Sequence, residues 1–225
     1  MEFMDVLKPM INVIYEDNHL LVVEKKINIP TQADDSHDMD LLTLLKEDLK
    51  KRYHKPGNVY LGLVHRLDRP VGGVMVFAKT SKAASRLSEQ VRNHQLEKTY
   101  HAVVHGDLAS HGHFEDFLLK DSKTNMVVVN PKGKHAILDY EVVAMKNSWS
   151  LVKIQLKTGR SHQIRVQFAS RNHPLYGDQR YNKDAKPGQQ IALFASRLSF
   201  YHPIHHEKLT FELPLPQRDI WNIFY

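Results

Sequence analysis

The chain is 225 residues long, 42% of its residues are hydrophobic, and it contains no cysteine. This hydrophobic content excludes a largely disordered chain, and the absence of thiols excludes disulfides, thiolate catalysis and cysteine-based zinc sites. The formal net charge of +6 favours a polyanionic partner, although many ordinary enzymes are equally basic.

The sequence carries no signal for export or for membrane insertion. Residues 1–26 lack the charged segment and apolar core of a signal peptide. No stretch approaches the roughly 20 apolar residues that a membrane-spanning helix needs. We therefore expect a soluble, cytoplasmic protein with no membrane partner.

The first predicted elements are a strand pair and a helix. Short β-rich runs at 12–16 and 20–25 are separated by a polar turn at 17–19, which predicts a hairpin. A helix is expected over 40–53, because its leucines recur at helical spacing. These leucines are Leu41, Leu44, Leu45 and Leu49.

The remaining predicted elements are mostly strands. In chain order, strands are expected at 59–64, 74–79, 97–105, 126–129, 136–144, 149–157, 192–201 and 209–213, and helices at 81–94 and 161–171. Because strands and helices do not alternate, a doubly wound parallel sheet is not favoured. The pattern predicts an α+β fold, with a mixed, mainly antiparallel sheet and a few flanking helices. Because the sequence contains no internal repeat and no linker, we expect one domain over residues 1–225.

An acidic residue in a shaped loop is the first candidate for chemistry. In Leu63–Val74 an apolar strand ends in His-Arg-Leu-Asp, and Pro70 and two glycines follow. Arg66 and Arg69 would keep the carboxylate of Asp68 ionised, as a nucleophile or a base requires. Taken alone, an aspartate in this setting is more often a brace for a turn, so both interpretations stay open.

Two further runs concentrate polar side chains at strand ends. Tyr100, in Lys-Thr-Tyr, stands inside a strand, where packing is the common role and stacking on a splayed RNA base the functional one. In Leu156–Phe168 a strand ends, Gly159 turns the chain, and a helix begins. The polar side chains of its first turns, where backbone amides favour anions, are Arg160, His162, Gln163 and Arg165. The alternative for this run is a solvated basic helix end.

In this order, the three runs resemble the motifs of pseudouridine synthases, most closely the RluA-type family, which converts uridine to pseudouridine in ribosomal or transfer RNA. The family's H-R-L-D motif is matched by His65–Asp68, its K-x-Y motif by Lys98–Tyr100, and its G-R-x-H-Q-[IL]-R-V motif by Gly159–Val166. Two flanking segments, Tyr15–Val23 and His173–Tyr181, resemble the family as well. The resemblance spans roughly residues 11 to 213 and implies the pseudouridine synthase fold.

The resemblance has three departures. The family usually has Thr-Ser-Gly shortly after the aspartate, where this chain has Val71-Gly72-Gly73. Its opening segment usually continues with Lys-Pro and a glycine, where this chain has Lys25-Lys26 and Asn28. Gln167 stands where histidine is common. These changes concern loop geometry and substrate contacts more than the chemistry.

The resemblance implies roles for individual residues. Asp68 is the catalytic carboxylate, which either attacks or deprotonates the substrate; Arg165 pairs with it, and Tyr100 stacks on the base. Arg66 fills the place left by the flipped base. The expected RNA contacts are His65, Arg66, Lys79, Lys98, Arg160, His162 and Gln163. No cofactor or metal is expected, because the reaction is redox-neutral and internal to the substrate.

Two other functions compete with this one. The loss of the Thr-Ser pair suggests a non-catalytic RNA-binding protein on the same fold. Fifteen histidines suggest a metal-dependent hydrolase, but H-E-x-x-H is missing and acidic ligands do not stand at helical spacing. Because only about ten residues precede the first matched strand, we expect a form without the family's N-terminal S4 RNA-binding domain. We also expect a monomer that reads a stem-loop of ribosomal or transfer RNA by its shape.

Overall fold

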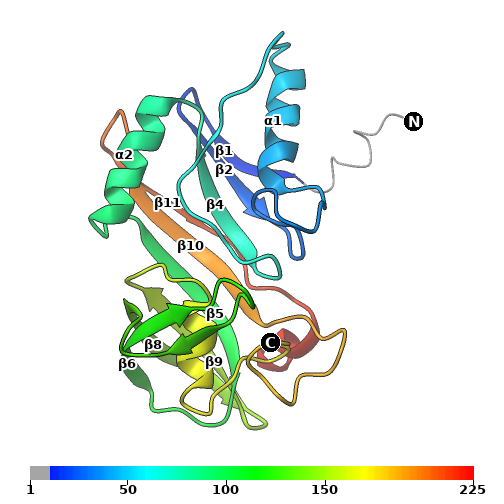
Figure 1. Cartoon of the computed structure of the whole chain (residues 1–225), viewed down its shortest axis with the longest axis vertical. Helices are drawn as coiled ribbons and strands as arrows, with labels where there is room; N and C mark the ends of the chain where they lie inside the picture. The colour runs from blue at the N-terminus through cyan, green and yellow to red at the C-terminus, as the bar shows by residue number, and fades with distance from the viewer. Residues whose placement is uncertain (1–10) are drawn as a thin grey trace. The chain divides into compact units, whose positions relative to one another are not determined.

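The computed structural model describes residues 11–225; residues 1–10, on which part of the signal-peptide prediction rests, lie outside the described residues. The chain forms two compact units (Figure 1). Of the described residues, unit 1 comprises 11–96 and Arg197–Leu213, and unit 2 comprises Glu97–Ser196 and Pro214–Tyr225. That residues 1–225 form one catalytic domain stays a prediction.

Unit 1 is built on antiparallel strands. Its elements are β1 (Asn12–Glu16), β2 (Leu20–Lys25), α1 (Leu41–Arg52), β3 (Gly62–Leu63), β4 (Gly72–Ala78), α2 (Ser81–Arg92) and β11 (Lys208–Glu212). Strand β2 lies between β1 and β4, β3 pairs with β4, and β11 pairs with the second half of β10 (Leu193–Tyr201). The predicted hairpin at 12–25 is confirmed.

The core of unit 1 surrounds β4, whose seven residues are all buried. Side chains alternate between the two faces of a strand, so burial at every position means that both faces are covered. Helix α2 covers the face that the even-numbered residues of β2 and β4 present. This cluster comprises Leu20, Val22, Val74, Val76, Ala78, Ala83, Leu87, Leu96, Leu198 and Phe200.

Both helices of unit 1 begin at a side-chain cap. Asp40 accepts a hydrogen bond from the Thr43 amide (3.0 Å), and Thr80 accepts one from the Ala83 amide (3.2 Å). Such caps satisfy amides that have no partner inside the helix. The four leucines of the predicted stripe on α1 are buried. Both predicted helices are confirmed, with ends that differ by one or two residues.

Unit 2 contains a five-stranded antiparallel ladder and one packed helix. Its elements are β5 (Glu97–His105), β6 (His111–Lys120), β7 (Val127–Val129), β8 (Lys134–Lys146), β9 (Trp149–Leu156), α3 (Gln163–Ala169), the first half of β10, and the 3-10 helix η2 (Asp219–Phe224). The strands pair in the order β5-β9-β8-β6-β7. Val166 of α3 packs against Leu118, Val127 and Ala136.

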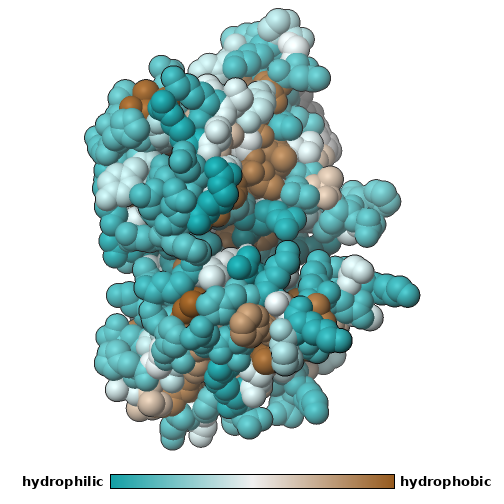
Figure 2. All heavy atoms as spheres, turned by 60° about the vertical axis from the view of Figure 1, so that its left-hand side comes forward, coloured by the Kyte–Doolittle hydropathy of each residue, from teal (hydrophilic) through white to brown (hydrophobic). Residues whose placement is uncertain are grey.

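The structure confirms the predicted fold class and corrects three elements. The strand expected at 59–64 contracts to Gly62–Leu63, and the helix expected at 161–171 begins only at Gln163, because His162 adopts left-handed angles (φ 50°). Strand β6 was missed, because exposed Phe117 and Leu119 obscure the alternation of its buried residues. No helix within residues 11–225 is long and apolar enough to cross a bilayer. On the face shown in Figure 2, hydrophobic side chains form small separate groups on a mostly hydrophilic surface.

Candidate catalytic and RNA-binding site

The loop that carries Asp68 joins β3 to β4 in unit 1. The Val71 amide donates to the Asp68 carbonyl (3.0 Å), which closes a tight turn over these four residues. Gly73 follows with φ 134°, a backbone conformation that side chains disfavour. Asp68 itself is partly exposed, between buried Leu67 and exposed Arg69. The carboxylate is therefore presented by a turn of defined shape.

A buried lysine braces this loop from β2. Lys25 is 0% exposed, and its Nζ donates to the carbonyl oxygens of Lys26 (3.1 Å), Arg69 (2.9 Å) and Val71 (2.7 Å). Three acceptors require three N–H donors, which the ammonium form supplies. Burial lowers the pKa of Lys25 to about 7, although the negative charge of Asp68 acts to raise it. Lys25 thus holds the backbone that follows Asp68 and interacts with the charge of the Asp68 carboxylate.

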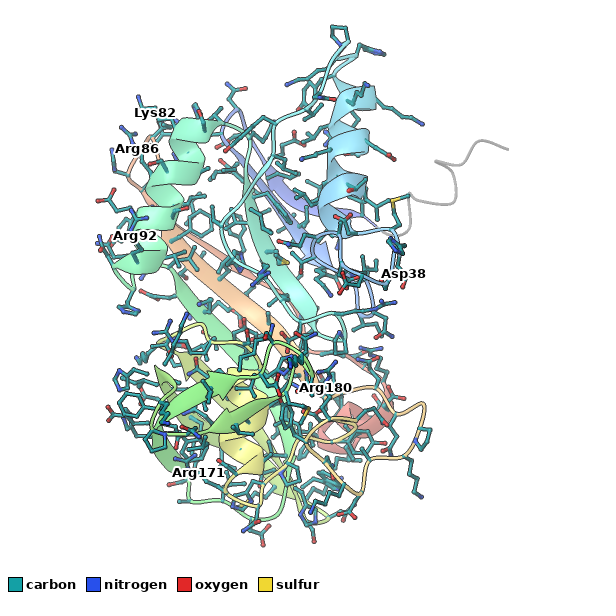
Figure 3. The ribbon with its side chains drawn as sticks, viewed as in Figure 1. Asp38, Lys82, Arg86, Arg92, Arg171 and Arg180 are labelled. Carbon is teal, nitrogen blue, oxygen red and sulfur yellow. The ribbon has the colours of Figure 1, made fainter. Side chains whose placement is uncertain are left out.

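Two further contacts anchor the same loop. The Thr31 hydroxyl, which is buried, donates to the Leu67 carbonyl (2.8 Å). The Arg69 guanidinium pairs with the carboxylate of Asp38, which Figure 3 labels in the segment before α1. The residues on both sides of Asp68 are therefore held by side chains from distant parts of unit 1. Neither Lys25 nor Thr31 was predicted from sequence as a support of the loop.

Three predicted RNA contacts belong to unit 1, and two of them make internal contacts. His65 Nε2 accepts a hydrogen bond from the Val76 amide (3.1 Å). Lys79 Nζ donates to Glu16 (2.6 Å) and to the Asp17 carbonyl (2.6 Å), and its side chain is only 14% exposed. Arg66 is exposed.

The Tyr100 motif lies on β5 of unit 2. Tyr100 stands opposite Ile154 of β9 and is 6% exposed. Two residues earlier, burial lowers the pKa of Lys98. A Cβ at Gly159 would lie 3.1 Å from Lys98 Nζ, so the bare backbone of this glycine leaves room for the ammonium. The structure thus brings the K-x-Y motif and the start of the third motif together within unit 2.

Arg165 of α3 is held by a buried carboxylate. Its Nε and Nη2 donate to the two oxygens of Asp178 at 2.8 and 2.7 Å, and the two side chains are 5% and 0% exposed. This bidentate geometry fixes the plane of the guanidinium. The ring of Tyr181 lies 5.2 Å from the guanidinium carbon. Sequence reasoning placed Asp178 in a family-like segment without this role, and pairing of Arg165 with Asp68 stays a prediction.

The other residues of the third motif shape the loop before α3. The side-chain oxygen of Gln163 accepts hydrogen bonds from Thr158 Oγ1 (2.8 Å) and from the backbone amide of Arg160 (3.1 Å). Its side-chain nitrogen donates to Ile137 O and Gln167 Oε1 (both 3.0 Å). Gln163 is 3% exposed, so all four hydrogen-bonding positions are satisfied internally.

His162 and Arg160 lie nearer the surface. Nδ1 of His162 hydrogen-bonds with Tyr181 Oη (2.7 Å). Arg160 is exposed and donates from Nε to the His135 carbonyl (2.7 Å). Contacts of any of these residues with RNA stay predictions. Within residues 11–225, no group of three or more His, Asp or Glu side chains is arranged to hold a metal ion.

A family model described as RNA pseudouridylate synthase matches residues 19–170. The chain belongs to this family. The match contains all three motifs and extends across both units. The RluA-type resemblance is confirmed, and the protein is an RNA pseudouridine synthase, an isomerase that acts on RNA.

Bacterial relatives of this pseudouridine synthase cover most of its length. It is 32% identical over 221 residues to ribosomal large subunit pseudouridine synthase D of Zymomonas mobilis, which covers 92% of this chain and 70% of the relative. It is 34% identical over 211 residues to RNA pseudouridine synthase YhcT of Bacillus subtilis, which covers 92% of this chain and 69% of the relative.

A solved structure shares the fold of this pseudouridine synthase. Human RNA pseudouridylate synthase domain containing 4 superposes with a TM-score of 0.78 at 22% identity, covering 95% of this chain and 91% of that one. At this sequence identity, the similarity supports the fold alone. It agrees with the antiparallel α+β architecture seen in each unit.

Proposed function

We propose that this pseudouridine synthase isomerises a specific uridine in structured ribosomal or transfer RNA, with Asp68 as the catalytic carboxylate. The observation that carries the proposal is the bracing of the Asp68 loop. Backbone carbonyls on both sides of Asp68 are tied to Lys25 and Thr31. A reacting group must be held close to its productive geometry, and a braced loop achieves this. Relatives named for the large ribosomal subunit favour ribosomal RNA as the substrate class.

The chemistry assigns a task to each motif. The N1–C1′ bond breaks, the base turns, and C5 bonds to C1′; C5 loses a proton and N1 gains one, so the product is an isomer. Because a stacked uridine cannot turn in place, the nucleotide is flipped into a pocket. Asp68 attacks or deprotonates the substrate, Arg165 orients Asp68, and Tyr100 stacks on the base. These steps call for neither a cofactor nor a metal.

The substrate contacts follow from exposure and charge. Arg66, beside Asp68, is exposed and fills the space that the flipped base vacates. Arg160 is the exposed cation of the third motif, and Lys98 is the half-buried cation of the K-x-Y motif. We also propose RNA contacts for His65, Lys79, His162 and Gln163, whose side chains hold internal hydrogen bonds. We propose a monomer as the active form, with an RNA stem-loop as its partner.

Replacement of Asp68 by asparagine tests the proposal. Asp68→Asn keeps the shape of the side chain and removes its charge and nucleophilicity, so we expect no pseudouridine above background. The measurement is chemical labelling of pseudouridine and reverse transcription of unmodified rRNA and tRNA transcripts. RNA affinity should stay within about threefold, because phosphate contacts supply most of it. The control, Asp35→Asn, changes an exposed acid of the same unit and should leave activity intact.

Two outcomes would overturn the proposal. Substantial pseudouridine formation by Asp68→Asn would remove Asp68 from the chemistry. Tight RNA binding by the wild type without pseudouridine in either RNA would favour the non-catalytic RNA-binding alternative.

A further inference from the structure

A dense group of cations lies on unit 1 outside the three motifs. It is formed by Lys50–Lys55, which includes the last turn of α1 and the turn that follows, and is called the basic segment below. Four of its six residues are Lys or Arg, and none is acidic. All six are exposed. The formal excess of the whole chain is only +6, so this short stretch carries an unusual share of positive charge.

The backbone folds the basic segment back on itself. The amide of Lys55 donates to the Lys50 carbonyl (3.0 Å), and the amide of His54 donates to the Lys51 carbonyl (3.2 Å). His54 adopts left-handed angles (φ 48°), the usual way in which a helix ends in this pattern. Cations that would spread along a continuing helix are therefore gathered around one turn.

A network of side chains holds this turn in place. Arg52 pairs with Glu16 (2.8 Å) and Asp48 (2.7 Å), and Tyr53 donates its hydroxyl to Glu16 (2.8 Å). Lys79, a predicted RNA contact, also binds Glu16 and lies 4.9 Å from the centre of the Tyr53 ring. Arg52 and Lys79 are thus neutralised by unit 1 and act as its brace.

The other lysines of the basic segment are not neutralised. Lys50, Lys51 and Lys55 form no ion pair with any carboxylate of residues 11–225. The helix dipole favours cations in the last turn of α1, which accounts for two of them. It does not account for Lys55, which follows the helix, and like charges at helical spacing repel one another. Cations gathered on a braced turn without counter-ions are complementary to a polyanion.

We propose that the basic segment binds the phosphate backbone of the RNA substrate as a contact separate from the three motifs. This rests on the proposed function, in which the substrate is a structured RNA. A phosphate contact carries no sequence information but sets register and affinity. Each lysine that binds a phosphate displaces a counter-ion, so the contact has a measurable signature in the salt dependence of binding.

The test compares two triple variants with equal loss of charge. The first is Lys50→Gln, Lys51→Gln and Lys55→Gln. The control is Lys82→Gln, Arg92→Gln and Lys146→Gln, which removes exposed cations elsewhere; Figure 3 shows the first two on α2. Binding to unmodified large-subunit rRNA transcribed in vitro is measured as a function of salt, together with kcat and KM for pseudouridine formation.

The basic-segment variant should lower the slope of log affinity against log salt by about 2 to 3, at 0.7 to 0.9 per phosphate contact. Its affinity at physiological salt should fall roughly 10- to 100-fold, as KM rises and kcat stays unchanged. The control variant should keep the wild-type slope. If the triple variant does not fold, Lys55→Glu alone, outside the helix, should still weaken binding.

The contrary outcomes separate this inference from the proposed function. Suppose that the wild type makes pseudouridine and that the two triple variants have the same salt slope and the same affinity. That result would overturn RNA binding by the basic segment and leave the proposed function standing. A wild type that makes no pseudouridine, while its slope still exceeds that of the basic-segment variant, would overturn the function and leave the RNA contact standing. If the basic-segment variant loses binding to anionic vesicles but keeps its binding to RNA, the basic segment is not an RNA contact.

Discussion

Replacement of Lys25 by methionine tests how the Asp68 loop is held. Methionine keeps most of the volume of lysine but cannot donate, so the carbonyls of Lys26, Arg69 and Val71 lose their shared partner. Three hydrogen bonds to a charged group contribute about 1.5–3 kcal/mol each. The cost of burying the ammonium offsets several kcal/mol of that sum. We therefore expect the free energy of unfolding to fall by about 2–4 kcal/mol, less than the 5–15 kcal/mol typical of folded proteins.

The assay pairs urea unfolding with single-turnover kinetics on an unmodified transcript. A loop that loses its brace should lower kcat by roughly 10- to 100-fold while KM changes little, since small misplacements of a reacting group carry such costs. The control is Lys26→Met, because Lys26 forms only a surface pair with Glu24 and its side chain is 41% exposed. If Lys25→Met unfolds and turns over like the wild type, the bracing role of Lys25 is wrong.

The remaining predictions concern the pH response of Lys25 and replacements of Tyr100, Asp178 and Gly72. Burial lowers the pKa of Lys25 to about 7 from its ordinary 10.5, so between these values the unfolded chain binds more protons. Wild-type stability relative to Lys25→Met should therefore rise from pH 7 to 10, and a flat difference in urea titrations would contradict this. Tyr100→Phe should retain at least about a tenth of kcat because stacking persists, and complete loss would point to proton transfer instead. Asp178→Asn should cost about 3–5 kcal/mol in urea unfolding, since it removes the carboxylate charge from a buried bidentate ion pair with Arg165; an unchanged midpoint would refute this. Gly72→Ser should cost about 1–3 kcal/mol, and less when combined with Ile27→Ala; strict additivity in that double-mutant cycle would refute the steric reason.

The elements that sequence reasoning predicted are those whose information is local. Strand β5 was predicted over its full length, because a continuous β-rich run suffices to define it, and the structure buries residues on both of its faces. Helix α1 and its leucine stripe follow from a spacing within twelve residues. The loop of Asp68 follows from the polar cluster, Pro70 and the glycines that separate two apolar strands.

The supports of the site could not be predicted in the same way, because they depend on contacts between distant segments. Lys25 reaches carbonyls that lie 44 and 46 positions further along the chain, and nothing near Lys25 marks those partners. A lysine at the end of an apolar run reads as exposed, since buried lysines are rare. Asp178 shows the same limit, because its pairing with Arg165 appears only once α3 is packed.

The backbone of unit 1 explains two of the departures from the family pattern, Asn28 and Gly72. Asn28, where the family usually has glycine, adopts left-handed angles (φ 63°), which asparagine tolerates better than most residues. A Cβ at Gly72 would lie 3.2 Å from both the Ile27 Cγ2 and the Lys25 carbonyl. The branched side chain of Ile27 therefore occupies space that a serine at 72 would need. The changed residue Gly72 therefore contacts the same segment, 25–28, that holds the changed residue Asn28, and the Lys25 brace and the Asp68 turn stay in place.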